Sequence, residues 1–332
     1  MRVSVIVAAR DEEFLQNTIL NLTNMVVKSL FEVIIIDDCS SNPVTIDSGF
    51  FPNVKVLRNK VQRGVGFCFD RGVSVAKGDI VVLMGSDVIV KDSSWILKVM
   101  KYVMDNPDSI GCSVCLSLDT EHLNPNKPAN EKKRYGANLL PFLTTEDIPS
   151  DSEILKWNSY HIEIFEGQWR KDIPQDNVSE VPCIYGAFYF TTKQWYNTIH
   201  GWDFSHMRWG GLEPWISIKN WLYGGRCHVV RDLETGHIFE KSERVINGRT
   251  DLFWYNKMFI THTILPPETA QRLLKKVYDL RIKNELPTRP FNMGEKLLRQ
   301  HWDRVLTVRD RNLREFKYDF DWYCDNFDIE KL

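Results

Sequence analysis

Carboxylates follow two apolar segments of strand length in the first ninety residues. Asp37 and Asp38 come directly after residues 32–36, and Asp87 comes shortly after the apolar residues 80–84, which a Gly-Asp turn precedes. The carboxyl ends of parallel strands share one edge of a sheet, so these carboxylates are expected to converge. With phosphate oxygens they suit Mg2+ or Mn2+, which keep octahedral oxygen coordination. The sequence therefore predicts that Asp87 holds a divalent metal, which in turn holds a nucleotide diphosphate.

The same carboxylates have a simpler structural interpretation. An Asp-Asp pair after a strand often forms a turn and caps the next helix. The Asp37-Asp38 pair alone does not separate the two interpretations. Both stay open until further residues are considered.

The first 118 residues alternate between strand and helix patterns, which would position these carboxylates. Strands are predicted at residues 3–8, 32–36, 53–57, 80–84 and 110–118, and helices at residues 12–27, 64–76 and around 96–103. Asp92 or Ser93 caps the third helix, and Asn106-Pro107 ends it. This alternation predicts an α/β fold with a doubly wound, mostly parallel central sheet flanked by helices.

Residues 119–156 lose the alternation, and four prolines interrupt a polar stretch. We predict a long loop or small insertion there. Strand patterns return at residues 160–165, 184–190 and 227–230, and a short helix follows Thr192. Residues 207–215 are aromatic and rich in glycine, and they open a helix that ends at Gly224-Gly225. From residue 266 onward, apolar residues at helical spacing predict two amphipathic helices, at 270–280 and 297–313.

The composition is that of an ordinary globular protein, with 43% hydrophobic and 26% charged residues and a net charge of -2. Seven scattered cysteines are typical of a reducing compartment. Cys112 and Cys115 form one C-x-x-C, interpreted as two small buried strand residues rather than a metal or redox site. A strand begins too early for a signal peptide, and no apolar run reaches the ~18 residues that span a bilayer. We expect a cytoplasmic protein without membrane contact.

Several segments resemble the GT-A glycosyltransferases of family 2. They are residues 3–12, residues 34–40 with their Asp-Asp pair, residues 63–79 from Arg-Gly-Val-Gly to Lys-Gly-Asp, and Asp87. The second half resembles the polypeptide N-acetylgalactosaminyltransferases. Residues 209–213 are similar to that family's Trp-Gly-Gly-Glu-Asn segment with one extra residue before Glu213, and Gly236-His237-Ile238-Phe239 is similar to its Gly-His-(Ile/Val)-Phe segment. The resemblance covers roughly residues 1–260 and implies a Rossmann-like GT-A fold.

This resemblance implies transfer of a sugar from a UDP-sugar with Mn2+ or Mg2+, and it implies roles for single residues. Asp87 and His237 would be the metal ligands. Glu213 and Trp209 would act with Asp87 at the reacting sugar, with Trp209 stacking on a sugar face. Gly186 would lie at the sugar and acceptor. The donor nucleotide would be bound by Ala8, Arg10, Glu12, Asp38, Arg63, Gly64 and Ser86, with Asp38 at the uracil or ribose.

The chain also departs from the family pattern. The family's Asp-Ser-His triplet is Gly85-Ser86-Asp87 here, so one carboxylate is lost and the metal site is weaker or is helped through water by Asp79 or Asp38. The family arginine after Gly-x-x is Phe67. Inverting members carry Glu-Asp, with the Asp as base, where this chain has Glu213-Pro214. The missing base predicts retention of configuration, with the leaving diphosphate taking the acceptor proton.

These patterns divide the chain into four segments. Residues 1–118 are the predicted nucleotide-sugar-binding half, residues 119–157 the insertion, and residues 158–265 the acceptor and catalytic half of the same domain. Residues 266–332 are a helical C-terminal extension. We expect neither the membrane anchor, the cysteine framework nor the C-terminal lectin domain of the secretory-pathway enzymes, so the acceptor need not be a polypeptide.

Basic residues outnumber acidic ones between residues 272 and 317, which fits binding to a phosphate backbone. Ordinary solvated helix faces are the alternative. Small soluble transferases of this kind also resemble phage enzymes that glycosylate hydroxymethylated pyrimidines in DNA, acting in the infected host's cytoplasm. Modified double-stranded DNA is therefore ranked narrowly first among acceptors, ahead of protein and glycans. A non-catalytic nucleotide-sugar-binding protein is the alternative of another class, because Gly85 reduces the metal site.

Overall fold

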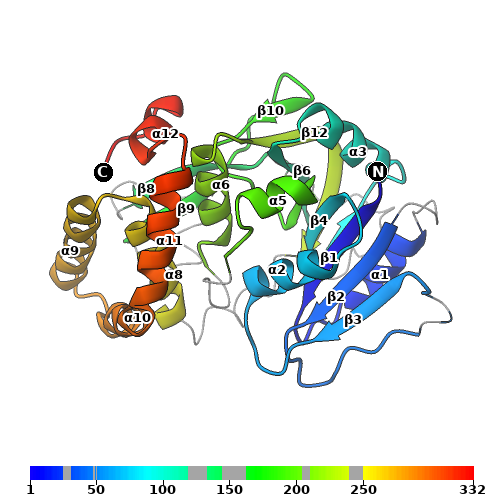
Figure 1. Ribbon diagram of the computed structural model, residues 1–332, viewed down its shortest axis with the longest axis horizontal. Coiled ribbons are helices and arrows are strands. Elements are labelled where there is room, and N and C mark those ends of the chain that lie inside the picture. Colours follow the sequence, from blue (N-terminus) through cyan, green and yellow to red (C-terminus); the bar gives the residue numbers. More distant parts are fainter. Residues whose placement is uncertain are drawn as a thin grey trace.

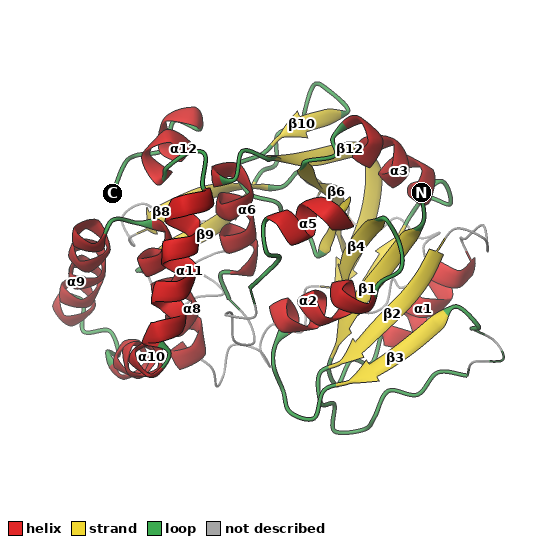
Figure 2. Cartoon of the chain, in the orientation of Figure 1, coloured by secondary structure: helices red, strands yellow, loops and turns green. Residues whose placement is uncertain are grey.

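The computed structural model describes residues 1–24, 31–47, 49, 51–118, 133–143, 162–203, 210–238 and 250–332. A twisted sheet forms the half of the molecule that contains the N-terminus, and helices lie on both of its faces (Figure 1). The C-terminal helices gather at the other end, beside α6 (Leu212–Leu222), as Figure 2 also shows. The architecture is therefore a helix-flanked sheet extended sideways by a helical group.

The strands of the described residues are β1 (Val3–Ala9), β2 (Phe31–Asp37), β3 (Val54–Arg58), β4 (Ile80–Gly85), β5 (Val88–Val90), β6 (Ser109–Leu118), β7 (Lys133–Arg134), β8 (Ala137–Leu143), β9 (Glu163–Trp169), β10 (Val178–Glu180), β11 (Phe188–Thr192) and β12 (Arg226–Ile238). The main sheet has the order β10-β12-β6-β11-β4-β1-β2-β3, with β5 beside β12 and β7 beside β6. Strands β8 and β9 form a separate antiparallel pair.

The longest pairings of the main sheet are parallel. Strands β1, β2, β3 and β4 pair in parallel, as do β6 and β12. Strand β11 lies antiparallel between β4 and β6. The predicted α/β fold with a mostly parallel central sheet flanked by helices is confirmed. The sheet is mixed beyond β4, however, because an antiparallel strand from the second half of the chain enters it.

The helices are α1 (Leu15–Asn24), α2 (Val65–Val75), α3 (Trp95–Asp105), α5 (Lys193–Thr198), α6 (Leu212–Leu222), α8 (Thr250–Ile264), α9 (Pro267–Lys283), α10 (Arg289–Gln300), α11 (Trp302–Glu315) and α12 (Phe320–Asn326). Those predicted before residue 118 are present, although residues 25–27 of the first lie outside the described part. The single helix predicted over 297–313 is wrong, because α10 ends at His301 and α11 starts a new direction there (Figure 1). The sequence patterns missed α8.

Residues 133–143 correct the prediction of an insertion loop. They form β7, which pairs with β6, and β8, which pairs with β9. The predicted strand at 160–165 is β9, displaced toward the C-terminus. Strand β7 has only two residues, and a proline interrupts β8, so neither shows the alternation of apolar and polar residues that predicts a strand. The rest of the predicted insertion lies outside the described residues.

Two hydrophobic clusters lie on opposite faces of the main sheet, because successive strand residues point to opposite sides. In β1, Val5 and Val7 belong to the cluster under α1 and α3, whereas Ile6 belongs to the one under α2. Helix α2 approaches β1 so closely that a Cβ at Gly72 would lie 2.3 Å from Cγ2 of Ile6. The second cluster continues without a break from Ile6 to Cys324 in α12. The division drawn at residue 266 therefore does not coincide with a break in the core.

Buried charges also join the C-terminal helices to the sheet domain. The side chain of Asp203 is 3% exposed and pairs with Arg304 at 3.0 Å, with Arg311, and with Lys219 of α6 at 3.6 Å. Asp203 lies just after α5, and both arginines come from α11. A buried carboxylate thus links three segments that are distant in sequence.

The cysteines are all free, and Cys112 and Cys115 are buried in β6. Burial raises the pKa of each of these two thiols to about 12. The interpretation of this C-x-x-C as two buried strand residues is confirmed. Within the described part of the chain, no helix is long and apolar enough to span a membrane.

Candidate active site

The turn after β4 brings Asp87 to His237. Strand β4 ends at Gly85, and β5 runs antiparallel to β12 in a register that sets Val88 opposite His237. Oδ1 of Asp87 lies 3.3 Å from Nε2 of His237. The two residues that the sequence assigns to the metal therefore meet at the carboxyl edge of the sheet, as expected for the ends of parallel strands.

The two side chains are mostly buried, with 16% of Asp87 and 20% of His237 exposed. Burial by itself lowers the pKa of His237, but the carboxylates of Asp87 and Glu213 outweigh it and raise the pKa above its usual value. The site therefore favours a positive charge at this point. A metal cation can supply that charge in place of the imidazole proton, because a ligating imidazole must be neutral.

Gly85 supplies no carboxylate to this site, so Asp87 and His237 are the two residues assigned to the metal that meet there. A Cβ at Gly85 would lie 3.0 Å from Oδ1 of Asp87, so a larger side chain would require Asp87 to move. No group of three His, Cys, Asp or Glu side chains in the described residues is arranged to hold a metal. The suggested help from Asp79 is wrong, since Asp79 precedes β4 and lies about 17 Å away at the other end of that strand.

Glu213 lies at the start of α6, near enough for its carboxylate to raise the pKa of His237. Its Oε1 accepts a hydrogen bond of 3.0 Å from the hydroxyl of Tyr189, which itself accepts the backbone N–H of Ala187 at 3.0 Å. Burial raises the pKa of Glu213, and the nearby Glu166 adds to the effect. Ala187 has a positive φ of 60° and follows Gly186, with a φ of 114°. The carbonyl of Ala187 accepts the N–H of Gly85, so this strained turn lies at the end of β4. The Tyr189 hydroxyl, which bonds both Ala187 and Glu213, links Glu213 to the same turn.

Two aromatic side chains, Trp169 and Tyr185, lie next to Gly186, and the sequence analysis did not identify them. The rings of Trp169 and Tyr185 meet edge to face with centroids 4.5 Å apart, and the guanidinium of Arg134 lies 5.0 Å from the Trp169 ring. A Cβ at Gly186 would lie 3.8 Å from the Trp169 ring, so Trp169 faces that glycine. Trp209, which the sequence assigned to sugar stacking, lies outside the described residues. Pattern reasoning had no signal for Trp169, which is the last residue of the short, weakly periodic strand β9.

Asp38 sits at the end of β2 with its carboxylate already occupied. It accepts hydrogen bonds from Asn59 Nδ2 at 2.7 Å and from the backbone N–H groups of Arg63 at 2.8 Å and Gly64 at 2.7 Å. The neighbouring Asp37 accepts from Ser40 and pairs with Arg58. The turn-forming interpretation of the Asp-Asp pair therefore describes the hydrogen bonds of both residues. Asp38 fixes the loop that begins α2, and its contact with the base or ribose stays a prediction.

The other residues assigned to the donor lie along the same edge. Ala8 precedes the last residue of β1, and the guanidinium of Arg10 lies 3.6 Å from the carboxylate of Asp11. Glu12 Oε1 accepts the N–H of Phe14 at 3.1 Å, and the carbonyl of Ser86 accepts the hydroxyl of Thr18 at 2.9 Å. These contacts order the loops after β1 and β4. Their roles toward a nucleotide stay predictions.

Comparison with known proteins agrees with this geometry. Residues 4–155 match the family model described as glycosyl transferase family 2. The chain is 25% identical over 216 residues to human polypeptide N-acetylgalactosaminyltransferase 10, covering 63% of this chain and 32% of that protein. It is 22% identical over 303 residues to Caenorhabditis elegans polypeptide N-acetylgalactosaminyltransferase 4, covering 90% of this chain and 45% of that protein. The chain thus spans less than half the length of these relatives.

Among solved structures, the fold is similar to that of GalNAc-T7 with UDP, GalNAc and Mn2+. The TM-score is 0.66 at 15% sequence identity, and the match covers 98% of this chain and 57% of the other. The predicted GT-A fold is confirmed. The resemblance to glycosyltransferases of family 2, and in particular to polypeptide N-acetylgalactosaminyltransferases, is confirmed as well.

Proposed function

We propose that this chain is a metal-dependent glycosyltransferase that moves a sugar from a UDP-sugar to an acceptor hydroxyl. The observation that carries the proposal is the pairing of Asp87 with His237 beside Glu213, at the carboxyl edge of a GT-A sheet. The match of residues 4–155 to glycosyl transferase family 2 and the UDP and Mn2+ named for the similar structure support the donor and the metal.

The donor set suits Mn2+ or Mg2+. Asp87 supplies a carboxylate oxygen and His237 a ring nitrogen, and the remaining positions would fall to diphosphate oxygens and water. A nitrogen ligand favours Mn2+ over Mg2+. When bound, the metal would stabilise negative charge on the departing diphosphate. On the donor side we assign Ala8, Arg10, Glu12 and Asp38 to the nucleoside, and Arg63, Gly64 and Ser86 to the region of the diphosphate.

The arrangement supports retention of configuration. Pro214 follows Glu213, so the first turn of α6 offers no second carboxylate to act as a base. In the proposed step the bond between the sugar carbon and the diphosphate breaks, and the acceptor oxygen bonds to that carbon on the same face. The acceptor proton passes to the leaving phosphate oxygen. Glu213 and Gly186 would line the sugar, with Trp209 as a further stacking residue.

For the acceptor, a protein hydroxyl is the first candidate, because the relatives of this chain are named as polypeptide transferases. Hydroxymethylated pyrimidine in DNA is the second, and the basic residues after 272 are the observation in its favour. Several of those cations are already neutralised: Arg304 and Arg311 pair with Asp203, Lys275 with Asp279, and Arg299 with Glu295. This lowers the positive charge that a DNA backbone would meet. A glycan hydroxyl is a third acceptor with the same chemistry.

Incubation with labelled UDP-sugars, Mn2+, a Ser/Thr-rich peptide mixture and hydroxymethylated DNA tests the proposal. We expect UDP release that EDTA abolishes, with label in the peptide fraction. Label in DNA instead would reverse the order of acceptors, and an inverted anomer in the product by NMR would contradict retention. Absence of UDP-sugar binding in the presence of metal would reject the enzyme. Binding without any release or transfer would favour the other class, a non-catalytic nucleotide-sugar-binding protein.

Glu213→Gln is expected to lower kcat/KM for UDP release by about 100-fold, the typical loss when a charged group at the reacting centre is removed. Gln keeps the size of the side chain and one oxygen for the Tyr189 hydroxyl. The control is Glu268→Gln, an exposed acid in the first turn of α9. If Glu213 serves only the α6 dipole, both variants will lose a little stability, and activity will stay unchanged.

A further inference from the structure

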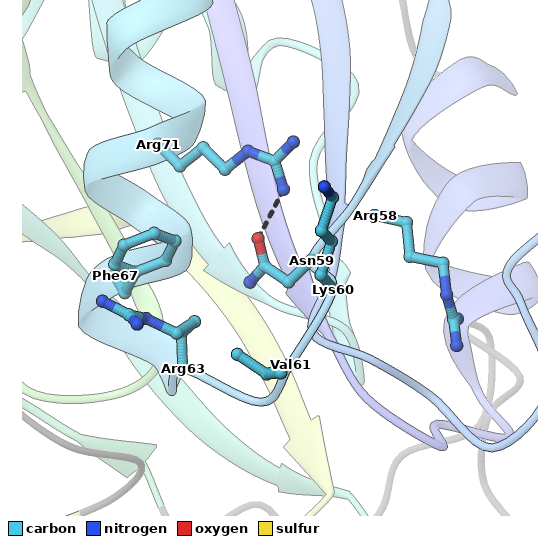
Figure 3. A pocket seen from close by; sticks show the side chains of 7 residues that line it. All are labelled: Arg58, Asn59, Lys60, Val61, Arg63, Phe67 and Arg71. Carbon is cyan, nitrogen blue, oxygen red and sulfur yellow. Dashed lines mark hydrogen bonds between the residues drawn. The ribbon is translucent and has the colours of Figure 1, made fainter.

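The candidate active site is basic at its donor end and acidic near Glu213. At the donor end, Lys60, Arg63 and Arg71 line a pocket between the end of β3 and the start of α2, and none of its lining residues is acidic (Figure 3). Arg63 is among the residues assigned to the diphosphate, so this pocket belongs to the donor. Near Glu213, however, β9 contributes a further carboxylate, that of Glu166. Glu166 takes no part in the steps described so far.

A buried lysine fixes one oxygen of Glu166. The side chain of Lys257, in α8, is 1% exposed, and its Nζ donates hydrogen bonds of 2.7 Å to Oε2 of Glu166 and to the carbonyl of Phe165. The stem of Lys257 lies against Gly211, where a Cβ would be 3.7 Å from Cδ of the lysine. Gly211 caps α6, two residues before Glu213. One lysine therefore sets the position of Glu166 relative to the start of α6.

The backbone before Glu166 is strained. Phe165 has a φ of 49° within β9, a conformation that is rare for a bulky residue. Such conformations persist only where the surrounding structure fixes them, and they cluster at functional sites. Here the hydrogen bond from Lys257 to the carbonyl of Phe165 helps to fix the backbone. Lys257 therefore holds both the carboxylate of Glu166 and the strained peptide that carries it.

The other oxygen of Glu166 is able to accept a stronger hydrogen bond than the one it has. Oε1 lies 3.5 Å from the hydroxyl of Tyr185, against about 2.7 Å for an ordinary O–H···O bond. The side chain of Glu166 is 22% exposed, although its partner Lys257 is buried. A carboxylate has about four lone-pair positions, so Oε1 keeps capacity for a donor from a ligand. Because Lys257 already orients the carboxylate, the entropy cost of such a contact is lowered.

Glu166 is close to Glu213 but comes from a different part of the fold. Burial is the main cause of the raised pKa of Glu213, and the charge of Glu166 adds to it. Tyr189 ties Glu213 to the turn at the end of β4, whereas Glu166 belongs to the separate β8–β9 pair. Strands of the main sheet hold Asp87 and His237. Since Glu213 is assigned to the sugar, a carboxylate that approaches it from outside the main sheet is placed to meet the second substrate.

We propose that Glu166 binds the acceptor, with Oε1 accepting a hydrogen bond from a donor group next to the reacting hydroxyl, and that Lys257 positions it for this contact. The inference rests on the proposed function. In that step the reacting hydroxyl gives its own proton to the leaving phosphate, so the group bound by Glu166 is a neighbouring N–H or O–H. In a peptide acceptor this group is the backbone N–H. Glu166 takes up no proton and orients the acceptor by a charge-assisted hydrogen bond.

Glu166→Gln tests this role with a labelled UDP-sugar, Mn2+ and the Ser/Thr-rich peptide mixture. We expect kcat/KM for the peptides to fall about 10-fold, mainly through a higher KM, which is equivalent to about 1.4 kcal/mol. UDP release without peptide, where water is the acceptor, is expected to stay unchanged, as is the affinity for UDP. The matched control is Glu180→Gln, which removes an exposed carboxylate paired with Arg226 at 3.2 Å and should change none of these values.

A second variant separates acceptor binding from a structural role. Glu166→Gln removes the carboxylate that the buried Lys257 contacts, so it is expected to lower the midpoint of urea unfolding. Glu166→Gln/Lys257→Met removes the buried charge as well and should regain stability. We expect peptide transfer to stay low in this double variant. Its recovery would show that Glu166 serves only to neutralise Lys257 and would overturn the proposal.

Peptide binding without turnover keeps this inference distinct from the proposed function. Fluorescence anisotropy of the labelled peptides, with UDP and Mn2+ present, is expected to show about 10-fold weaker binding to Glu166→Gln than to the wild type. That result supports the role of Glu166 even where the wild type transfers no sugar, in which case the proposed function alone fails. Equal binding and equal KM in the variant overturn the acceptor role and leave the transferase intact. A wild-type chain that neither binds nor glycosylates the peptides also overturns it.

Discussion

Asp87→Asn is expected to lower Mn2+-dependent release of UDP from a UDP-sugar by more than about 100-fold. Substitution of groups that only orient metal ligands already costs 10–100-fold. Asp87 is one of two proposed protein ligands, and Gly85 leaves no neighbouring carboxylate to replace it. Asn keeps the shape of the side chain but removes the charge that attracts the cation. Steady-state UDP release at saturating Mn2+, with Mn2+ affinity from equilibrium dialysis, measures both effects.

The control for this variant is Asp105→Asn, at an exposed position of α3 where the carboxylate pairs with the exposed Lys101. It removes the same charge far from the edge of the sheet and is expected to change neither rate nor Mn2+ affinity. Recovery of the Asp87→Asn rate at high Mn2+ would show a weakened but working site. An unchanged rate at low Mn2+ would remove Asp87 from the metal, and with it the observation on which the proposed function rests.

Asp203→Asn is expected to destabilise the chain by about 3 kcal/mol, the usual cost of leaving buried charges without their partner. Lys219 is fully buried and Arg311 is 15% exposed, so both lose the group that compensates them. Asn is chosen over Ala because the φ of residue 203 is +73°, a conformation that Asn tolerates well. The midpoint of urea unfolding at pH 7 measures the change.

The matched control is Asp310→Asn, on the exposed side of the same helix α11. Burial alone raises the pKa of Asp203, but Lys219, Arg311 and Arg304 outweigh it and hold the pKa below its usual value. A depressed pKa stabilises the fold above the unfolded-state value of about 3.9 and ceases to do so as the pH falls through the folded value. The difference between wild type and Asp203→Asn should therefore shrink below about pH 4. A constant difference would exclude charge as its cause.

The N-terminal half could be predicted because its signals are local. Unbroken apolar runs such as Ile80–Gly85 identify buried strands, and the residues between them carry helical spacing. The C-terminal half depends on contacts that no local pattern contains. Helix α8 is buried on several sides because β9, α10 and α11 pack against it, and its buried residues include polar ones such as Asn256 and Lys257. It therefore lacks the one-sided apolar pattern that identifies a helix. Strand β11 shows its strand character in the sequence but not its direction.

Candidate residues divide in the same way. Asp87 and His237 were identified by motif, and the pairing of β5 with β12 brings them to 3.3 Å. Asp38 was identified by motif too, yet its carboxylate is satisfied by the loop before α2. Trp169 and Arg134 belong to no motif. They reach the edge of the sheet because β7 pairs with β6 and because β9 pairs with β8, and no local sequence pattern predicts these pairings.

Residue order alone determined the class of fold and the two residues proposed to hold the metal, because strand periodicity and short motifs are properties of neighbouring residues. Tertiary structure decided which groups meet. It set Gly85 tight against Asp87, turned Asp38 toward its own loop, and gathered Lys60, Arg63 and Arg71 around a pocket without a carboxylate. Whether a charge is neutralised depends on the partners that the folded chain places within a few ångströms of it, and those partners are distant in sequence.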